Sequence, residues 1–160
     1  MKRFSAMIGA LAFSCGLLAG CGEQPEKLSV YSFCGENEQF ALENGIIVLT
    51  EDKEVITGGD LRAKTEPAPA VSAYIKTIYL LVEQEPVPLL TSGVEDKTGG
   101  NVFLVKDSPA KLSGAGGSLT QNEEHLENNL FLQLEITDPQ GEQASYEIPL
   151  EVTEILTETE

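Results

Sequence analysis

The hydrophobic pattern divides the chain into an uninterrupted apolar start and a much longer remainder of short alternating segments. Residues 4–18 are apolar or small and none is charged, whereas after residue 26 apolar and polar positions alternate between turn signals. A period of two predicts strands that bury one face, and no long stretch has the period of an amphipathic helix. We therefore expect an all-β protein behind the apolar start.

Two segments near the C-terminus alternate most clearly. Residues 130–137 and 145–152 both alternate apolar and polar side chains, and Asp138-Pro139-Gln140-Gly141 between them has the residue preferences of a type I turn. Together they predict an antiparallel hairpin. Proline cannot donate to a ladder, so Pro149 predicts an edge position or a bulge in the second strand.

Shorter segments of the same kind fill the rest of the chain. Asn44-Gly45 is the strongest short hairpin signal, and Gly58-Gly59 indicates a bulge or turn. Pro86 and Pro88 break the segment after residue 82, and Thr120-Gln121-Asn122-Glu123 resembles the capping box of a short helix. The other expected strands are residues 28–34, 39–43, 46–50, 54–57, 61–64, 74–82, 102–105 and 110–113.

The number of strands predicts the architecture. About seven to nine short strands over residues 27–156 favour an immunoglobulin-like two-sheet antiparallel sandwich, followed by an acidic tail at 157–160. A small barrel is the alternative. A chain of 160 residues corresponds to one domain.

Charge narrows the classes of partner. The chain has 26 acidic and 10 basic residues, a formal net charge of −16 and an isoelectric point of about 4.3. Binding to nucleic acid needs clustered Lys and Arg to neutralise phosphates, so we expect no nucleic acid partner. The same charge disfavours adhesion of the protein surface to anionic lipid headgroups.

The apolar start has the layout of an export signal. Lys2 and Arg3 precede an apolar run that is shorter than the roughly 20 residues of a membrane span. Leu18-Ala19-Gly20-Cys21 resembles the lipobox of bacterial lipoproteins, so residues 1–20 are identified as a lipoprotein signal peptide. An uncleaved helix or ordinary secretion is the alternative.

The lipobox resemblance implies cleavage after Gly20, a diacylglycerol thioether on Cys21 and a lipidated tether at 21–26. The membrane is then a partner through this lipid, because two acyl chains hold a protein stably whereas one binds only marginally. Cleavage would leave 8 basic and 26 acidic residues and a side-chain charge of −18, since Lys2 and Arg3 leave with no acid. We expect the extracytoplasmic face of a Gram-positive cell membrane, and Gly22 leaves an outer membrane open.

Further motifs resemble those of small Gram-positive lipoproteins of unknown function. Ser32-Phe33-Cys34-Gly35-Glu36-Asn37-Glu38 resembles their opening motif, and residues 134–150 resemble their closing hairpin. Phe40 and Thr137 stand near or at positions where that group carries tryptophan. The resemblance implies a β-sandwich domain outside the membrane and no particular activity.

Candidate chemistry is sparse. We expect Cys34, the one thiol left after lipidation of Cys21, to be buried, and His125 to lie in an exposed loop beside Glu123 and Glu124. One histidine and one thiol do not make a zinc or copper site. The acidic pairs at 51–52, 95–96 and 123–124 lack the spacing of a calcium loop. We therefore predict no catalytic residue, metal or cofactor.

These observations favour a membrane-anchored, non-enzymatic module that binds an envelope protein or peptide. Two alternatives stay open. A small secreted sandwich can inhibit proteases, with residues 86–90 displayed as the inhibitory loop. The other is an enzyme that uses Cys34 or His125, where a Cys-His site would need the two residues to meet in space.

Overall fold

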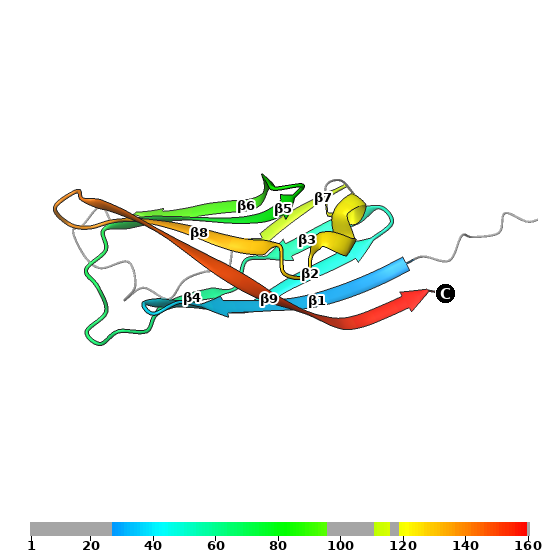
Figure 1. Ribbon diagram of the computed structural model, residues 1–160, viewed down its shortest axis with the longest axis horizontal. Helices are drawn as coiled ribbons and strands as arrows, with labels where there is room; N and C mark the ends of the chain where they lie inside the picture. The colour runs from blue at the N-terminus through cyan, green and yellow to red at the C-terminus, as the bar shows by residue number, and fades with distance from the viewer. Residues whose placement is uncertain (1–26, 96–110, 116–118, 160) are drawn as a thin grey trace, which may run out of the picture.

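The computed structural model describes residues 27–95, 111–115 and 119–159, which form an all-β domain (Figure 1). This confirms the predicted class. A 3₁₀ helix, η2 (Thr120–His125), precedes β8. The strands are β1 (Lys27–Glu36), β2 (Phe40–Thr50), β3 (Lys53–Thr57), β4 (Asp60–Ala63), β5 (Ala73–Val82), β6 (Glu85–Glu95), β7 (Lys111–Ala115), β8 (Leu130–Thr137) and β9 (Gln143–Thr159). The predicted signal peptide at 1–20, the tether at 21–26 and the strand at 102–105 lie outside the described residues.

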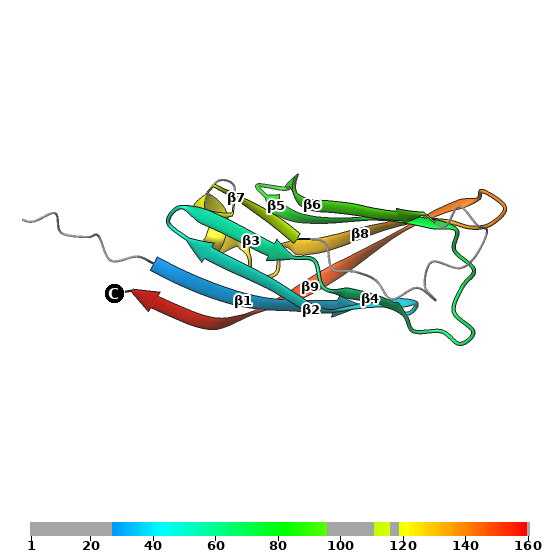
Figure 2. The same cartoon turned by 180° about the vertical axis from the view of Figure 1, so that it is seen from behind.

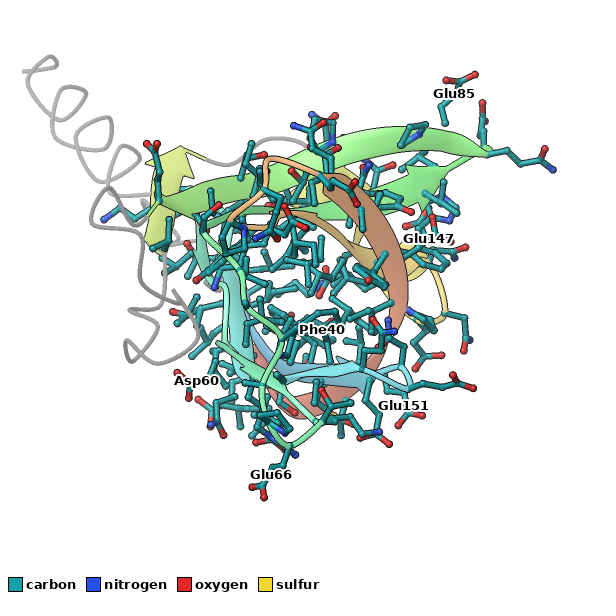
Figure 3. All side chains as sticks on the ribbon, turned by 90° about the vertical axis from the view of Figure 1, so that its left-hand side faces the viewer. Phe40, Asp60, Glu66, Glu85, Glu147 and Glu151 are labelled. Atoms are coloured by element: carbon teal, nitrogen blue, oxygen red, sulfur yellow. The ribbon has the colours of Figure 1, made fainter. Side chains whose placement is uncertain are left out.

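The strands form one antiparallel sheet in the order β6-β5-β8-β9-β1-β2-β3-β7, with β4 paired to β2. β9 joins the two parts of this sheet, because residues 143–150 pair with β8 and residues 151–159 pair with β1. Figures 1 and 2 show β9 crossing from the layer of β5, β6 and β8 to the layer of β1 and β2. The sheet thus curls nearly closed around one core (Figure 3). The two-sheet sandwich stays a prediction.

The core lies inside this curled sheet and follows from strand alternation. In β8 every second residue from Leu130 to Ile136 is buried. Phe40 is fully buried and points into the interior, whereas Glu66 and Glu85 project from the surface (Figure 3). Leucine, isoleucine and phenylalanine side chains supply most of the buried volume.

The predicted C-terminal hairpin is confirmed. β8 and β9 pair in antiparallel register, and between them the Gly141 N–H donates to the Asp138 carbonyl at 3.0 Å. The Asp138 carboxylate accepts from two further backbone N–H groups of the turn, each at 2.8 Å. Asp at the first turn position therefore satisfies the backbone groups that the reversal exposes.

The hairpin predicted at Asn44-Gly45 is wrong. β2 runs through both residues, and the chain reverses at Glu51-Asp52 between β2 and β3. Asn44 has a positive φ of 59°, which interrupts the ladder. β2 pairs with β4 before this point and with β3 after it, and Gly58-Gly59 separates β3 from β4. Gly58-Gly59 thus interrupts the strand pairing, but β3 and β4 both run antiparallel to β2, so the chain makes no turn there, and with two residues opposite two there is no bulge.

Phe33 explains why a glycine stands at position 45. The two residues are direct partners in the β1–β2 ladder, and a Cβ on Gly45 would lie 2.2 Å from the Phe33 ring. An aromatic ring packed over a glycine of the neighbouring strand shields the backbone and fixes the register. Gly45 therefore serves packing between strands rather than chain reversal.

One of the two proline predictions needs correction. Pro149 lies in β9, which stands between β8 and β1 in the strand order, but at this residue only β8 is paired, so the position is locally an edge, as predicted. Its missing N–H is tolerated since the ladder with β1 starts only at Glu151. Pro86 and Pro88 do not break a segment but lie inside β6, an edge strand of the described sheet, which needs ladder bonds on one side only.

The predicted acidic tail at 157–160 belongs to a strand as far as Thr159. β9 pairs with β1 up to Lys27↔Thr159, so the domain extends beyond residue 156. The start of β1 and the end of β9 therefore lie side by side. Figures 1 and 2 place them at the end of the molecule that carries η2 and the β2–β3 turn.

We expect Gly45→Ala to lower the free energy of unfolding by about 1–3 kcal/mol, because the added methyl group overlaps the Phe33 ring. Phe33→Leu removes ring atoms, so the same alanine should cost less in that background. Urea unfolding of the wild type, both single variants and the double variant measures this coupling. Equal costs in the two backgrounds would contradict the overlap.

Candidate functional site

The start of β1 directs polar side chains toward the interior. Because Phe33 takes an inward position, alternation places Tyr31 and Ser29 on the same inner face and Val30 and Leu28 on the outer face. Ser29 is fully buried and Tyr31 is half-buried. The inner face at this end of the sheet therefore needs polar partners, which η2 supplies.

Glu54 of β3 holds η2 over this end of the sheet. Its carboxylate accepts hydrogen bonds from the backbone N–H groups of Leu119 and Thr120, both at 2.9 Å. Leu119 is the N-cap residue and makes no side-chain cap. A helical turn forms where it was predicted, but the capping box of Thr120 and Glu123 is wrong, because a carboxylate from another strand satisfies the helix start.

Glu123 joins η2 to β1 through two hydrogen bonds. The Lys27 ammonium donates to one carboxylate oxygen, and the Tyr31 hydroxyl donates to the other at 2.6 Å. Burial acts to raise the pKa of Glu123, but the hydrogen bonds from Lys27 and Tyr31 outweigh it and hold that pKa below its usual value. Burial, followed by the hydrogen bond to Glu123, raises the pKa of Tyr31 to about 12. At neutral pH Glu123 is charged and Tyr31 is neutral.

A cavity of about 440 Å³ adjoins this pair, and we call it the acidic cavity. Four carboxylates and one ammonium line it, so its net charge is negative. The buried Ser29 hydroxyl lies next to Tyr31 and Glu123. The cavity can hold a cationic or hydrogen-bonding group. Its lining residues are Lys27, Tyr31, Glu123, Glu124, Leu126, Glu127, Glu154 and Thr157.

A second pair of tyrosine and carboxylate lies on the outer face of the other layer. The Tyr79 hydroxyl donates to Glu147 at 2.7 Å, and the Tyr79 ring stacks on Phe131 with centroids 5.6 Å apart. Burial, followed by the hydrogen bond to Glu147, raises the pKa of Tyr79 to about 12. Because the same shift occurs in two different settings, we attribute the raised tyrosine pKa values to packing rather than to catalysis.

The Cys34 thiol is exposed, which corrects the expectation that it is buried. Phe33 points inward, so the next residue along β1 points outward, opposite Glu151 of β9. Cys34 helps to line a surface cavity of about 580 Å³ whose other lining residues include Glu36 and Pro149. No histidine is among the residues that line it.

His125 lies at the end of η2 and not next to the thiol. Its Nε2 is 4.0 Å from a carboxylate oxygen of Glu124, and its side chain is 40% exposed. This agrees with the expected exposure beside glutamates, although the residue belongs to a helix rather than to a loop. Because His125 does not line the cavity of Cys34, the structure does not bring the two residues together as a Cys-His site would need.

The acidic pairs considered for calcium lie in different places. Glu51-Asp52 forms the β2–β3 turn, Glu123-Glu124 lies in η2, and Asp96 lies outside the described residues. Within residues 27–95, 111–115 and 119–159, no group of three or more His, Cys, Asp or Glu is placed to hold a metal ion.

Sequence reasoning missed the contact between Tyr31 and Glu123, which are 92 residues apart. A partial signal was available, because Lys27, Ser29 and Tyr31 occupy the alternate positions that lead to Phe33. If Phe33 is assigned to the core, these polar residues face inward as well. The sequence offers no comparable signal for Glu123, which it shows only as one member of an acidic pair.

Comparison with known proteins finds no match for this chain. No protein-family model matches the chain, and neither a curated protein nor a solved structure matches it. Of the described residues, none forms a helix that is both long and apolar enough to cross a bilayer.

We expect Glu123→Gln to lower the pKa of Tyr31 from about 12 toward 10 without reaching it, since burial persists when the charge is removed. NMR titration of the tyrosine ring carbons measures this shift. Glu147→Gln is the matched control and should move Tyr79 instead. An unchanged Tyr31 in Glu123→Gln would contradict the contact.

The same pKa values predict how stability depends on pH. The folded pKa of Tyr31 lies above its ordinary value of 10.0, so its contribution to stability is complete below pH 10 and is lost as the pH rises toward 12. The folded pKa of Glu123 lies below its ordinary value of 4.5, so its contribution is complete above that pH and is lost as the pH falls. Thermal unfolding across both ranges checks the two signs.

Proposed function

We propose that this chain is a lipid-anchored, non-enzymatic interaction module on the extracytoplasmic face of a bacterial cell membrane. The observation that carries this proposal is the lipobox-like Leu18-Ala19-Gly20-Cys21 behind a charged and apolar start. Cys21 would hold the lipid, and residues 22–26 would link it to β1. We favour a Gram-positive membrane over an outer membrane. We also propose that the two layers of the curled sheet act as the two sheets of an immunoglobulin-like sandwich.

The partner we propose is an envelope protein or peptide that presents a cationic segment. The acidic cavity already accepts one ammonium group, that of Lys27 on Glu123. Glu124, Glu127 and Glu154 add negative charge that this single ammonium does not balance. The negative electrostatic potential of these carboxylates speeds association with a cationic partner and disfavours an anionic one.

The two alternatives have weaker support. Residues 86–90, considered as an inhibitory loop, belong to β6, and Leu89 and Leu90 are buried. Cys34 is accessible, as a thiol-dependent enzyme requires, and this is the one observation in favour of that function. An enzyme that uses Cys34 therefore ranks second and a protease inhibitor third.

The anchor is tested in a bacterial host by intact-mass spectrometry and membrane fractionation. We expect the mature chain to begin at Cys21 and to carry a diacylglycerol group that holds it in the membrane fraction. Cys21→Ser should abolish lipidation, whereas Cys34→Ser, the matched control, should stay lipidated. An unmodified Cys21 in the wild-type protein would overturn the anchor.

The cationic partner is tested with a fluorescent oligolysine peptide. We expect the triple variant Glu124→Gln, Glu127→Gln, Glu154→Gln to bind it several-fold more weakly than the wild type, because three of the four carboxylates of the acidic cavity lose their charge. Fluorescence anisotropy at physiological salt measures both affinities.

The control for this experiment changes the net charge equally without touching the acidic cavity. Glu66, Glu83 and Glu85 are exposed and do not line it, so their triple replacement by Gln should leave peptide binding nearly unchanged. Equal losses in the two triple variants would show that net charge, and not the cavity, binds the peptide.

A further inference from the structure

The outer face of β9, β1, β2 and β3 carries a row of apolar side chains. Leu156 pairs with Val30, Val30 pairs with Val48, and Val48 pairs with Val55. Direct partners in neighbouring strands share one face of a sheet, so the four side chains are contiguous across four strands. We call Leu156, Val30, Val48 and Val55 the apolar row.

The apolar row faces away from the core. The residues that alternate with it, Ile47 and Leu49 in β2 and Ile56 in β3, are buried in the interior. The row itself is more accessible: Leu156 is 37% exposed, and the three valines are half-buried. Outward-facing Leu28 and Ile46, each two positions away along its strand, extend this apolar surface.

The ion pairs of this outer face lie away from the apolar row. Among the described residues, Lys53 and Glu158, one of each sign, stand two positions beyond row members in β3 and β9, and Glu51 and Asp52 form the adjoining β2–β3 turn. The far end of the face has the ion pairs, between Arg62 and Glu43 at 2.6 Å and between Lys64 and Glu36 at 3.1 Å. The apolar row lies toward the opposite end of the face, where β1 begins (Figures 1 and 2).

We propose that the apolar row rests on the surface of the membrane that holds the lipid of Cys21, so that the domain lies on its side with β1 and β2 against the bilayer. This inference rests on the proposed lipid anchor. Five residues, 22–26, separate Cys21 from Lys27, and fully extended they span at most about 17 Å. The lipid therefore keeps the start of β1, and the apolar row with it, close to the bilayer.

The two faces of β1 make this orientation favourable. A side-chain charge of −18 repels anionic headgroups, and the acidic cavity lies on the inner side of β1, away from the surface that would contact lipid. The apolar row can contact the lipid interface without bringing a carboxylate cluster to it. Apolar contact of this kind adds to the hold of the acyl chains. The short tether favours lipid over a second copy of the chain as the occupant.

The test places a single tryptophan on the apolar row of the lipidated, full-length protein. The natural chain has no tryptophan, so Leu156→Trp introduces one reporter at an exposed position. Ile75→Trp is the matched control, because Ile75 is 47% exposed on β5 in the other layer. Both variants are reconstituted in phosphatidylcholine vesicles with brominated acyl chains, after intact mass and circular dichroism show lipidation and folding.

We expect brominated lipid to quench the fluorescence of Leu156→Trp at least twofold more than that of Ile75→Trp. Adding Val30→Thr, Val48→Thr and Val55→Thr to Leu156→Trp should reduce this quenching, since the threonines keep the shape of the row but make it polar.

Every other outcome overturns the inference in a recognisable way. If the protein is lipidated and neither tryptophan is quenched, the anchor stands and the docking of the apolar row is wrong. Equal quenching at both positions would show that the domain has no fixed orientation. A concentration-dependent blue shift of Leu156→Trp without quenching would assign the row to a second copy. Only an unlipidated wild-type protein would overturn the proposed function as well.

Discussion

The packing of Phe33 over Gly45 fixes the register between β1 and β2, and the rest of this end of the molecule depends on it. A side chain larger than hydrogen at position 45 would overlap the ring, so the two strands pair with Phe33 inward. A slip of one residue would exchange the two faces of β1. Tyr31 and Ser29 would then turn outward, and Leu28 and Val30 would turn toward η2.

Two surfaces of opposite character arise from this single register. On the inner face, polar residues of β1 meet carboxylates of η2 and β9 and form the acidic cavity. On the outer face, the residues between them form part of the apolar row. β1 therefore separates a charged cavity on one face from an apolar surface on the other.

β9 connects the two layers of the curled sheet. It pairs with β8 along its first half and with β1 along its second half, and it changes partner just after Pro149. The change of partner lets one strand belong to both layers without leaving a ladder bond unmade at the proline. Glu54 connects η2 to the sheet. Its carboxylate on β3 accepts the hydrogen bonds of the first backbone N–H groups of the helix, which has no side-chain cap of its own.

The sequence by itself determined the elements that local chemistry specifies. Alternation determined the β8–β9 hairpin, Asp138 and Gly141 its turn, and Gly58-Gly59 the break between β3 and β4. The export signal and the lipobox are also local patterns, and they stay predictions. In each case a few neighbouring residues hold the whole signal.

Only the tertiary structure decided which partners these elements find. Asn44-Gly45 has the local chemistry of a hairpin, yet the ring of Phe33 on another strand turns it into a packing site. Tyr31 and Glu123 meet although 92 residues separate them, and Cys34 is exposed because its neighbour fills the core. Contacts between distant residues depend on strand order and on the face of each side chain, and local propensity specifies neither.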